Sequence, residues 1–177
     1  MEPFEVISSE KVYDGRIIRV ESDVLRMPDG KSAGREVVIK SEAAAVVPVD
    51  GDGNIIFVRQ YRHAFRGETI EIPAGVLDPG EEPLQCAARE LEEETGKIAG
   101  KMTKLFDMWP SIGFCTEIVH IYLAEDLREG KRNLDPDEFV EVLSFGPEEA
   151  LRRIESGGIP DSKTIAGVLA YCRRTGK

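Results

Sequence analysis

Residues that mark several common classes of protein are scarce in this 177-residue chain. Its three cysteines, Cys86, Cys115 and Cys172, are widely spaced and form no CxxC pair, which argues against a zinc site and a disulfide framework. No apolar run approaches the roughly 18 residues that span a bilayer, and the first residues lack the apolar stretch of a secretion signal. We therefore expect a chain that works in the reducing cytoplasm and has no membrane partner.

Basic residues are also in the minority. Lysine and arginine total 23 against 33 aspartate and glutamate residues, which gives a formal net charge of −10 and a pI near 4.8. The basic residues are scattered, so no patch is predicted that would attract a nucleic-acid backbone. With 41% hydrophobic residues, the chain is long enough for one domain with a sizeable core and a small accessory layer.

Turn residues divide the chain into short segments rich in β-branched residues. Asp14-Gly15 and Asp29-Gly30 separate three such segments within residues 4–40, which predict a small antiparallel sheet. A second hairpin is expected from residues 43–50 and 55–62 around the turn DGDGN. The alternating segment 69–76 predicts a further strand, which Pro73 and Gly75 end. The remaining expected elements are strands near 102–109, 117–125 and 138–145 and helices at 147–156 and 161–174. The last helix follows Pro160-Asp161-Ser162, which is an N-cap signal. Many strands with few helices predict a mixed α/β sandwich rather than a doubly wound parallel sheet.

One helix is expected between Pro83, which suits a first turn, and Gly96, which suits a C-cap. On this helix Glu90, Glu93 and Glu94 fall within about 100° of one another, so their carboxylates crowd one face. Like charges at this spacing repel one another, and a hard divalent cation such as Mg2+ or Mn2+ turns the repulsion into binding. The sequence therefore predicts a metal site on this face.

The same helix has an apolar stripe beside its acidic face. The stripe consists of Leu84, Ala88 and Leu91, which point within about 60° of one another. The pattern predicts that the helix buries this stripe and presents the glutamates outward. Cys86 lies on the glutamate side, where we expect it to be a small buried residue that fills space.

The spacing around this helix resembles the signature of the Nudix hydrolases. All its polar and glycine positions are met, by Gly75, Glu81, Arg89, Glu90, Glu93, Glu94 and Gly96, and Lys97 replaces the final aliphatic residue. Other segments are similar to the ADP-ribose pyrophosphatase branch of that superfamily: RQYR at 59–62, EIPAG at 71–75, SIGFCTE at 111–117 and NLDPDEF at 133–139. Ile112 stands where that branch usually has a proline, which leaves the substrate open but not the type of reaction.

The resemblance implies a Nudix-type α/β/α sandwich with a mixed β-sheet and an N-terminal antiparallel β-layer. Residues 1–40 would form that layer and join two copies in a homodimer, and residues 41–177 would form the hydrolase domain. The implied reaction is Mg2+-dependent hydrolysis of the pyrophosphate bond of ADP-ribose, or of a related nucleoside diphosphate sugar, to AMP and ribose 5-phosphate.

Two alternatives remain at this point. The enzyme could act on another small molecule, such as GDP-mannose, NADH, FAD or a nucleoside triphosphate. The fold could also serve as a module that senses nucleotides without cleaving them, although the complete set of three glutamates argues against this.

The resemblance also implies a role for each site residue. The metal ligands would be the backbone carbonyl of Ala74 together with Glu90, Glu93 and Glu94. Arg89 would assist catalysis with Glu93 by orienting the glutamates, and Glu138 would be the general base, with Asp135 and Asp137 as alternatives. Substrate contacts would come from Arg59, Arg62, Glu71, Ser111, Gly113 and Glu117. Because residues 59 and 62 of a strand face opposite sides, we favour Arg62 for the direct phosphate contact.

Overall fold

The computed structural model describes residues 4–134 and 139–176. The chain separates into two compact units. The first unit combines the chain up to Glu42 with Trp109–Ile118, and the second unit combines Ala43–Met108 with the chain from Val119 onward. Among the described residues, none of the helices has both the length and the apolar character needed to cross a bilayer.

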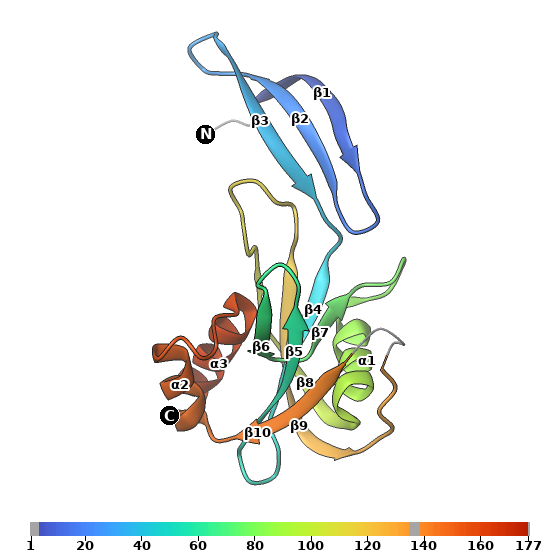
Figure 1. The fold of residues 1–177 in the computed structure, drawn as a ribbon, viewed down its shortest axis with the longest axis vertical. Coiled ribbons are helices and arrows are strands. Elements are labelled where there is room, and N and C mark those ends of the chain that lie inside the picture. Colours follow the sequence, from blue (N-terminus) through green and yellow to red (C-terminus); the bar gives the residue numbers. More distant parts are fainter. Residues whose placement is uncertain (1–3, 135–138, 177) are drawn as a thin grey trace. The chain divides into compact units, whose positions relative to one another are not determined.

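Three antiparallel strands make up most of the first unit (Figure 1). They are β1 (Glu5–Asp14), β2 (Arg19–Arg26) and β3 (Ser32–Ile39), in the order β1-β2-β3. Gly30 has a φ of +83° in the turn between β2 and β3, a conformation that glycine adopts without strain. The segment Trp109–Ile118 joins this unit beside β3, where the Val38 amide donates to the Phe114 carbonyl at 2.7 Å. The predicted N-terminal antiparallel layer is confirmed.

The second unit contains two sheets and three helices (Figure 1). The larger sheet has the order β7-β4-β9-β8 and is mixed, since β4 runs parallel to β9 and antiparallel to β7. The smaller sheet is antiparallel and has the order β10-β5-β6. The strands are β4 (Ala43–Pro48), β5 (Ile55–Arg62), β6 (Gly67–Glu71), β7 (Ala74–Val76), β8 (Lys97–Met108), β9 (Val119–Glu129) and β10 (Val140–Phe145). The helices are α1 (Pro83–Thr95), α2 (Pro147–Glu155) and α3 (Ser162–Thr175).

Strand β4 shows how the layers are stacked, because all six of its residues are buried. Ala44 and Val46 pack in a cluster with Leu91 of α1. The alternate residues, such as Val47, pack in the main core with Phe57 of β5 and other side chains from α2 and α3. A strand buried on both faces needs a layer on each side, so the predicted α/β/α sandwich with a mixed sheet is confirmed.

The predicted hairpin of residues 43–50 and 55–62 is wrong. Strands β4 and β5 belong to different sheets, and only an isolated bridge between Val49 and Ile55 joins their ends. The Asp50 carboxylate accepts bonds from the amides of Asp52 and Asn54 at 2.9 Å, so the turn does form. The turn forms a corner between sheets, and it joins β4 to the first half of β5 (residues 55–58), both of which are buried on their two faces.

The strand predicted within residues 69–76 ends before Pro73, as expected, but Gly75 lies inside a second short strand that was not predicted. Strand β6 ends at Glu71 in the smaller sheet, and β7 begins at Ala74 in the larger one. Pro73 lies at the crossing, where its carbonyl accepts from the Val46 amide at 3.0 Å. A proline cannot donate to a ladder, so this position suits a change of sheet.

Helix α1 has the predicted ends but not the predicted buried face. Pro83 is its first residue, and the Gly96 cap has a φ of +70° with its amide bonded to the Glu92 carbonyl. Leu84 is 47% exposed, and only Leu91 of the expected stripe is buried. The helix instead turns its small residues Cys86 and Ala87 and the acidic Glu90 and Glu94 inward, so that only Glu93 of the three glutamates stays partly exposed.

Candidate functional site

Arg89 holds three carboxylates around the start of α1. Its Nε and Nη2 donate to the two oxygens of Glu81, each at 2.9 Å, and its Nη1 donates to Glu90 at 2.6 Å and Glu93 at 3.0 Å. The hydrogen bonds from Arg89 hold the pKa of Glu81 at about 2, so this carboxyl stays ionised. One guanidinium therefore fixes the orientation of three of the acidic side chains of the signature.

Gly75 lies against the carboxylate of Glu90. A Cβ atom at Gly75 would be 1.8 Å from Glu90 Oε1, so only glycine leaves room for this carboxylate. The Cys86 thiol donates to the Gly75 carbonyl at 3.5 Å, and burial raises the pKa of Cys86 to about 12. Cys86 is thus a buried neutral thiol, as predicted, in the wall of the site.

Glu94 connects α1 to β7. Its Oε2 accepts a hydrogen bond from the Ala74 amide at 3.2 Å, and the residue is 2% exposed. Ala74 is thereby placed next to the buried acidic face of the helix. The carbonyl of Ala74 and the carboxylates of Glu90, Glu93 and Glu94 are the groups that the sequence assigned to a metal.

The donor chemistry of this group fits a hard divalent cation, which prefers carboxylate and carbonyl oxygens. Within the described parts of the chain, no three His, Cys, Asp or Glu side chains are already arranged around a common point for an ion. Arg89 Nη1 contacts one oxygen of Glu90 and one of Glu93, so it orients both carboxylates through a single oxygen each.

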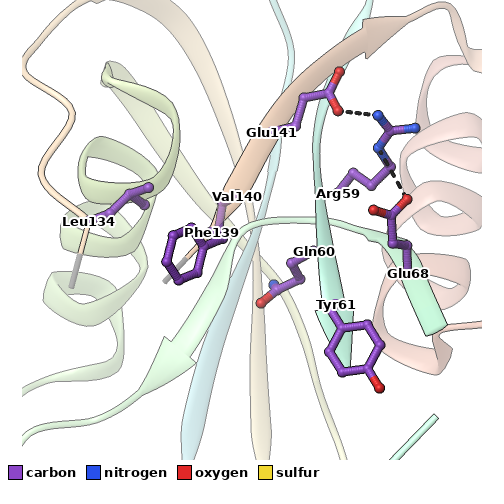
Figure 2. A pocket seen from close by; sticks show the side chains of 8 residues that line it. All are labelled: Arg59, Gln60, Tyr61, Glu68, Leu134, Phe139, Val140 and Glu141. Atoms are coloured by element: carbon purple, nitrogen blue, oxygen red, sulfur yellow. Dashed lines mark hydrogen bonds and ion pairs between the residues drawn. The ribbon is translucent and has the colours of Figure 1, made fainter. Parts of the chain in front are cut away.

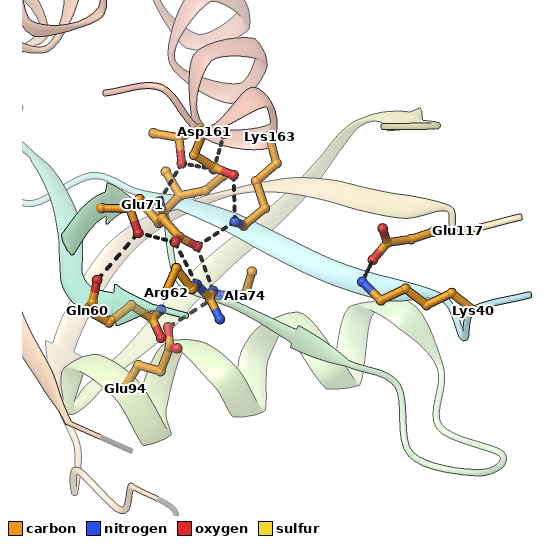
Figure 3. A network of polar contacts seen from close by, with 12 residues as sticks. Lys40, Gln60, Arg62, Glu71, Ala74, Glu94, Glu117, Asp161 and Lys163 are labelled. Atoms are coloured by element: carbon orange, nitrogen blue, oxygen red, sulfur yellow. Dashed lines mark hydrogen bonds and ion pairs between the residues drawn. The ribbon is translucent and has the colours of Figure 1, made fainter. Parts of the chain in front are cut away.

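A second polar network surrounds Glu71 at the end of β6 (Figure 3). Arg62 Nε and Nη2 donate to the two oxygens of Glu71 at 2.8 and 2.7 Å, and the Thr69 hydroxyl donates to Oε1 at 2.6 Å. The Glu71 side chain is 4% exposed, whereas that of Arg62 is 44% exposed. Arg62 is therefore held by a buried carboxylate while part of its surface stays open to solvent.

Helix α3 contributes a lysine to the same carboxylate. Lys163 Nζ donates to Glu71 Oε2 at 2.6 Å and lies 3.0 Å from Asp161 Oδ1. The sequence indicated only the helix N-cap at Asp161, which the structure confirms through a bond from the Thr164 amide at 3.0 Å. Sequence reasoning missed Lys163, because a separation of 92 positions from Glu71 leaves no local pattern.

Arg59 lies apart from this network, beside a cavity of about 430 Å³ (Figure 2). Its guanidinium is paired with Glu141 of β10 and lies 3.7 Å from Glu68 of β6. Side chains from β5, β6 and β10 and from the end of the preceding loop line the cavity: Arg59, Gln60, Tyr61, Glu68, Leu134, Phe139, Val140 and Glu141. Arg59 and Arg62 thus enter different ion pairs, in agreement with opposite strand faces.

The remaining predicted substrate residues belong to the first unit. Glu117 forms an ion pair with Lys40 within that unit. The Ser111 carbonyl accepts from the amides of Phe114 and Cys115, and no other atom approaches the site of a Cβ on Gly113 within 4 Å. Their roles stay predictions. The proposed base Glu138 and its alternatives Asp135 and Asp137 lie outside the described residues.

Comparison with known proteins gives consistent matches over most of the chain. The model of the NUDIX domain matches residues 40–166, and that of the nucleoside diphosphate sugar hydrolase N-terminal domain matches residues 4–38. The ADP-ribose pyrophosphatase of Bacillus subtilis is 45% identical over 93% of this chain and 90% of its own length. The enzyme of the same name from Mycobacterium tuberculosis is 44% identical over 94% of this chain and 82% of its own.

Two further matches are more distant. The GDP-mannose pyrophosphatase of Citrobacter koseri is 33% identical over 86% of this chain and 81% of its own length. A solved structure described as an ADP compounds hydrolase superposes with a TM-score of 0.89 over 99% of this chain and 97% of that chain. Its sequence identity is 22%, so this likeness concerns the fold.

Proposed function

Because the chain belongs to the Nudix hydrolase family, we propose that it cleaves the pyrophosphate bond of ADP-ribose to give AMP and ribose 5-phosphate. The observation that carries the proposal is the acidic centre at α1, where Arg89 orients Glu81, Glu90 and Glu93 and Gly75 leaves room for Glu90. Two relatives of 45% and 44% identity that bear the name ADP-ribose pyrophosphatase support this choice of substrate.

The metal in this proposal is Mg2+, with Mn2+ as a possible replacement. The Ala74 carbonyl and the carboxylates of Glu90, Glu93 and Glu94 would hold it. When bound, such a cation neutralises the charge of the diphosphate and favours ionisation of the attacking water. Arg89 would keep Glu90 and Glu93 in place between substrate molecules, because its Nη1 donates to both while Glu81 holds its Nε and Nη2.

The other site residues would bind the substrate and accept the proton of the attacking water. Arg62, held by Glu71, would donate its outward N–H groups to a phosphate oxygen. Glu138, or one of Asp135 and Asp137, would accept the proton of the attacking water. Arg59, Ser111, Gly113 and Glu117 would complete the substrate contacts.

A second candidate substrate is GDP-mannose, which the relative of 33% identity favours. Both substrates are a nucleoside diphosphate joined to a sugar, so the same acidic centre and Arg62 serve either. A nucleotide-sensing module without catalysis is a weaker proposal. The whole acidic set is retained here, and sensing alone does not require it.

We also propose that residues 1–40 join two copies of the chain. Every residue of β1 is exposed, and its hydrophobic side chains Val6, Ile7 and Val12 are 54%, 43% and 56% exposed. Hydrophobic side chains left exposed on neighbouring positions are typical of a subunit contact. Light scattering after gel filtration tests this, and a monomer at micromolar concentration would refute it. We propose the cytoplasm as the location, because the three cysteines, all within the described residues, form no disulfide.

The function is tested by incubating the purified protein with Mg2+ and one substrate at a time. The panel is ADP-ribose, GDP-mannose, NADH, FAD and nucleoside triphosphates, with products identified by mass spectrometry. We expect AMP and ribose 5-phosphate from ADP-ribose at the highest kcat/KM. Glu94→Gln should abolish turnover, whereas Glu129→Gln, at an 84% exposed side chain paired with Lys97, is the matched control. No turnover of any substrate by the wild type would reject the proposal.

A further inference from the structure

We propose that Lys163, in the first turn of α3, is a positioning residue for substrate binding: it fixes the carboxylate of Glu71 and, through it, the guanidinium of Arg62. The inference rests on the proposed function, in which Arg62 contacts a phosphate of the substrate. It adds helix α3, which carries no part of the Nudix signature, to the groups that determine substrate affinity.

The Glu71 carboxylate receives four donors, two on each oxygen. Oε1 accepts from Arg62 Nε and the Thr69 hydroxyl, and Oε2 accepts from Arg62 Nη2 and Lys163 Nζ. A carboxylate in which each oxygen accepts two hydrogen bonds is fixed in rotation as well as in position. The plane of the Arg62 guanidinium, which pairs with it side by side, is then fixed too (Figure 3).

This arrangement leaves the outer edge of Arg62 available for a ligand. Its Nε and Nη2 face Glu71, and among the described residues its Nη1 makes no hydrogen bond. The side chain is 44% exposed, while Glu71 and Lys163 are 4% and 14% exposed. Only Arg62 of the three can therefore reach a bound phosphate, and the other two act behind it.

Burying most of a lysine side chain lowers the stability of the folded protein unless its charge is compensated or serves a function. Removing an ammonium group from water is unfavourable, and an apolar side chain of the same length would fill the space without that cost. Lys163 is paired with both Glu71 and Asp161, so its charge is compensated, and it supplies the second cation on Glu71. Without it, Oε2 keeps only the bond from Arg62, and the carboxylate can rotate with the arginine.

The helix end itself is held independently of the lysine. The Ile72 amide donates to the Thr164 hydroxyl at 2.9 Å, and that hydroxyl donates to Asp161 at 2.5 Å. Both bonds persist when the side chain at position 163 is changed. A substitution of Lys163 removes its contact with Asp161 Oδ1, but Asp161 Oδ2 still accepts from Thr164, so α3 is expected to stay in place.

The test compares Lys163→Met and Lys163→Arg with the wild type, on the substrate that the panel identifies. We expect Lys163→Met to raise KM about tenfold with kcat changed less than about twofold, and Lys163→Arg to restore KM to within about threefold. Lys101→Met is the control, because Lys101 forms an exposed ion pair with Glu125 on another strand pair. Melting temperatures of all variants are measured alongside.

A double-mutant cycle separates positioning from general structure. If Lys163 acts through Arg62, the variant with both Arg62→Met and Lys163→Met binds substrate no more weakly than Arg62→Met alone. The inference would be overturned if the losses of substrate affinity in the two single variants multiply in the double variant, or if Lys163→Met leaves KM unchanged. The proposed function would stand in either case. If Lys163→Met does not fold, Lys163→Gln, which keeps a donor without the charge, replaces it with the same expected rise in KM. If the wild type turns over no substrate, both proposals are rejected together.

Discussion

Gly75 and Glu90 are so close that a Cβ atom on the glycine would overlap the glutamate carboxylate, at 1.8 Å from Oε1 and 2.1 Å from its carbon. The backbone of Gly75 does not have a positive φ, so the need for glycine here is one of space and not of conformation. The carboxylate is the far end of a flexible side chain, and it can move aside if the space is taken. The closeness therefore matters for where Glu90 points more than for folding.

Gly75→Ala should consequently separate activity from stability. We expect kcat to fall at least about tenfold because Glu90 leaves its place, while the free energy of unfolding changes by less than about 1 kcal/mol. Gly51→Ala is the matched control, since no atom lies within 4 Å of a Cβ there and its φ is not positive. Urea unfolding and initial rates provide the two measurements. A stable variant with full activity would show that the position of Glu90 is unimportant.

Arg89 gives a different prediction, because it neutralises carboxylates that otherwise repel one another. Arg89→Met should destabilise the protein in the absence of metal by about 1–3 kcal/mol, the usual value for losing hydrogen bonds between charged groups. Added Mg2+ should restore part of the loss, since the freed carboxylates of Glu90 and Glu93 then bind the ion. The melting temperature with EDTA and with Mg2+ measures both effects. A variant that melts at the same temperature as the wild type in EDTA would contradict the role of Arg89.

Local features of the sequence predicted local features of the fold. Pro83 and Gly96 gave both ends of α1, and Asp161 gave the start of α3, because caps depend on neighbouring residues only. The signature around Glu90 identified the acidic centre for the same reason. The spacing of the signature residues determines which side chains meet within one loop and one helix.

Features that depend on distant segments were not predictable in this way. The turn at Asp50 suited a hairpin, yet the partners of β4 are β7 and β9, which no pattern near the turn specifies. The buried face of α1 was misjudged because Cys86 and Ala87, and not Leu84, pack with Ala44 and Val46 of β4, and no pattern within the helix specifies that contact. Lys163 meets Glu71 only through the packing of α3 on the sheet.

Thr164 offers a test of how α3 is attached. Its hydroxyl is fully buried, accepts from the Ile72 amide at 2.9 Å and donates to Asp161 at 2.5 Å. Thr164→Val keeps the shape but leaves the buried Ile72 amide without this acceptor, which should cost about 1–3 kcal/mol of stability. Thr175→Val, at the exposed end of the same helix, should cost less than about 0.5 kcal/mol. Equal losses in the two variants would argue against the buried bond.

Glu71 should make the stability of the protein depend on pH in the acidic range. Burial alone would raise its pKa, but the hydrogen bonds from Arg62 and the charge of Lys163 outweigh burial and lower the pKa from 4.5 to about 2. A carboxyl with a depressed pKa in the folded state contributes stability that is fully present above pH 4.5 and lost as the pH falls through 2. In this window the unfolded chain binds the proton more readily, so stability rises with pH.

Glu71→Gln removes that dependence and leaves the largely buried Lys163 and the partly exposed Arg62 without their shared carboxylate. At pH 7 the variant should be less stable than the wild type by an amount of the order of 3 kcal/mol, and the difference should shrink as the pH falls from about 5 towards 2. Denaturant unfolding at several pH values measures it. Glu68→Gln, on the same strand but 65% exposed, is the control and should show little difference at any pH. A constant difference between wild type and Glu71→Gln across this range would mean that Glu71 is already protonated in the folded protein, and that Arg62 and Lys163 do not hold it as an anion.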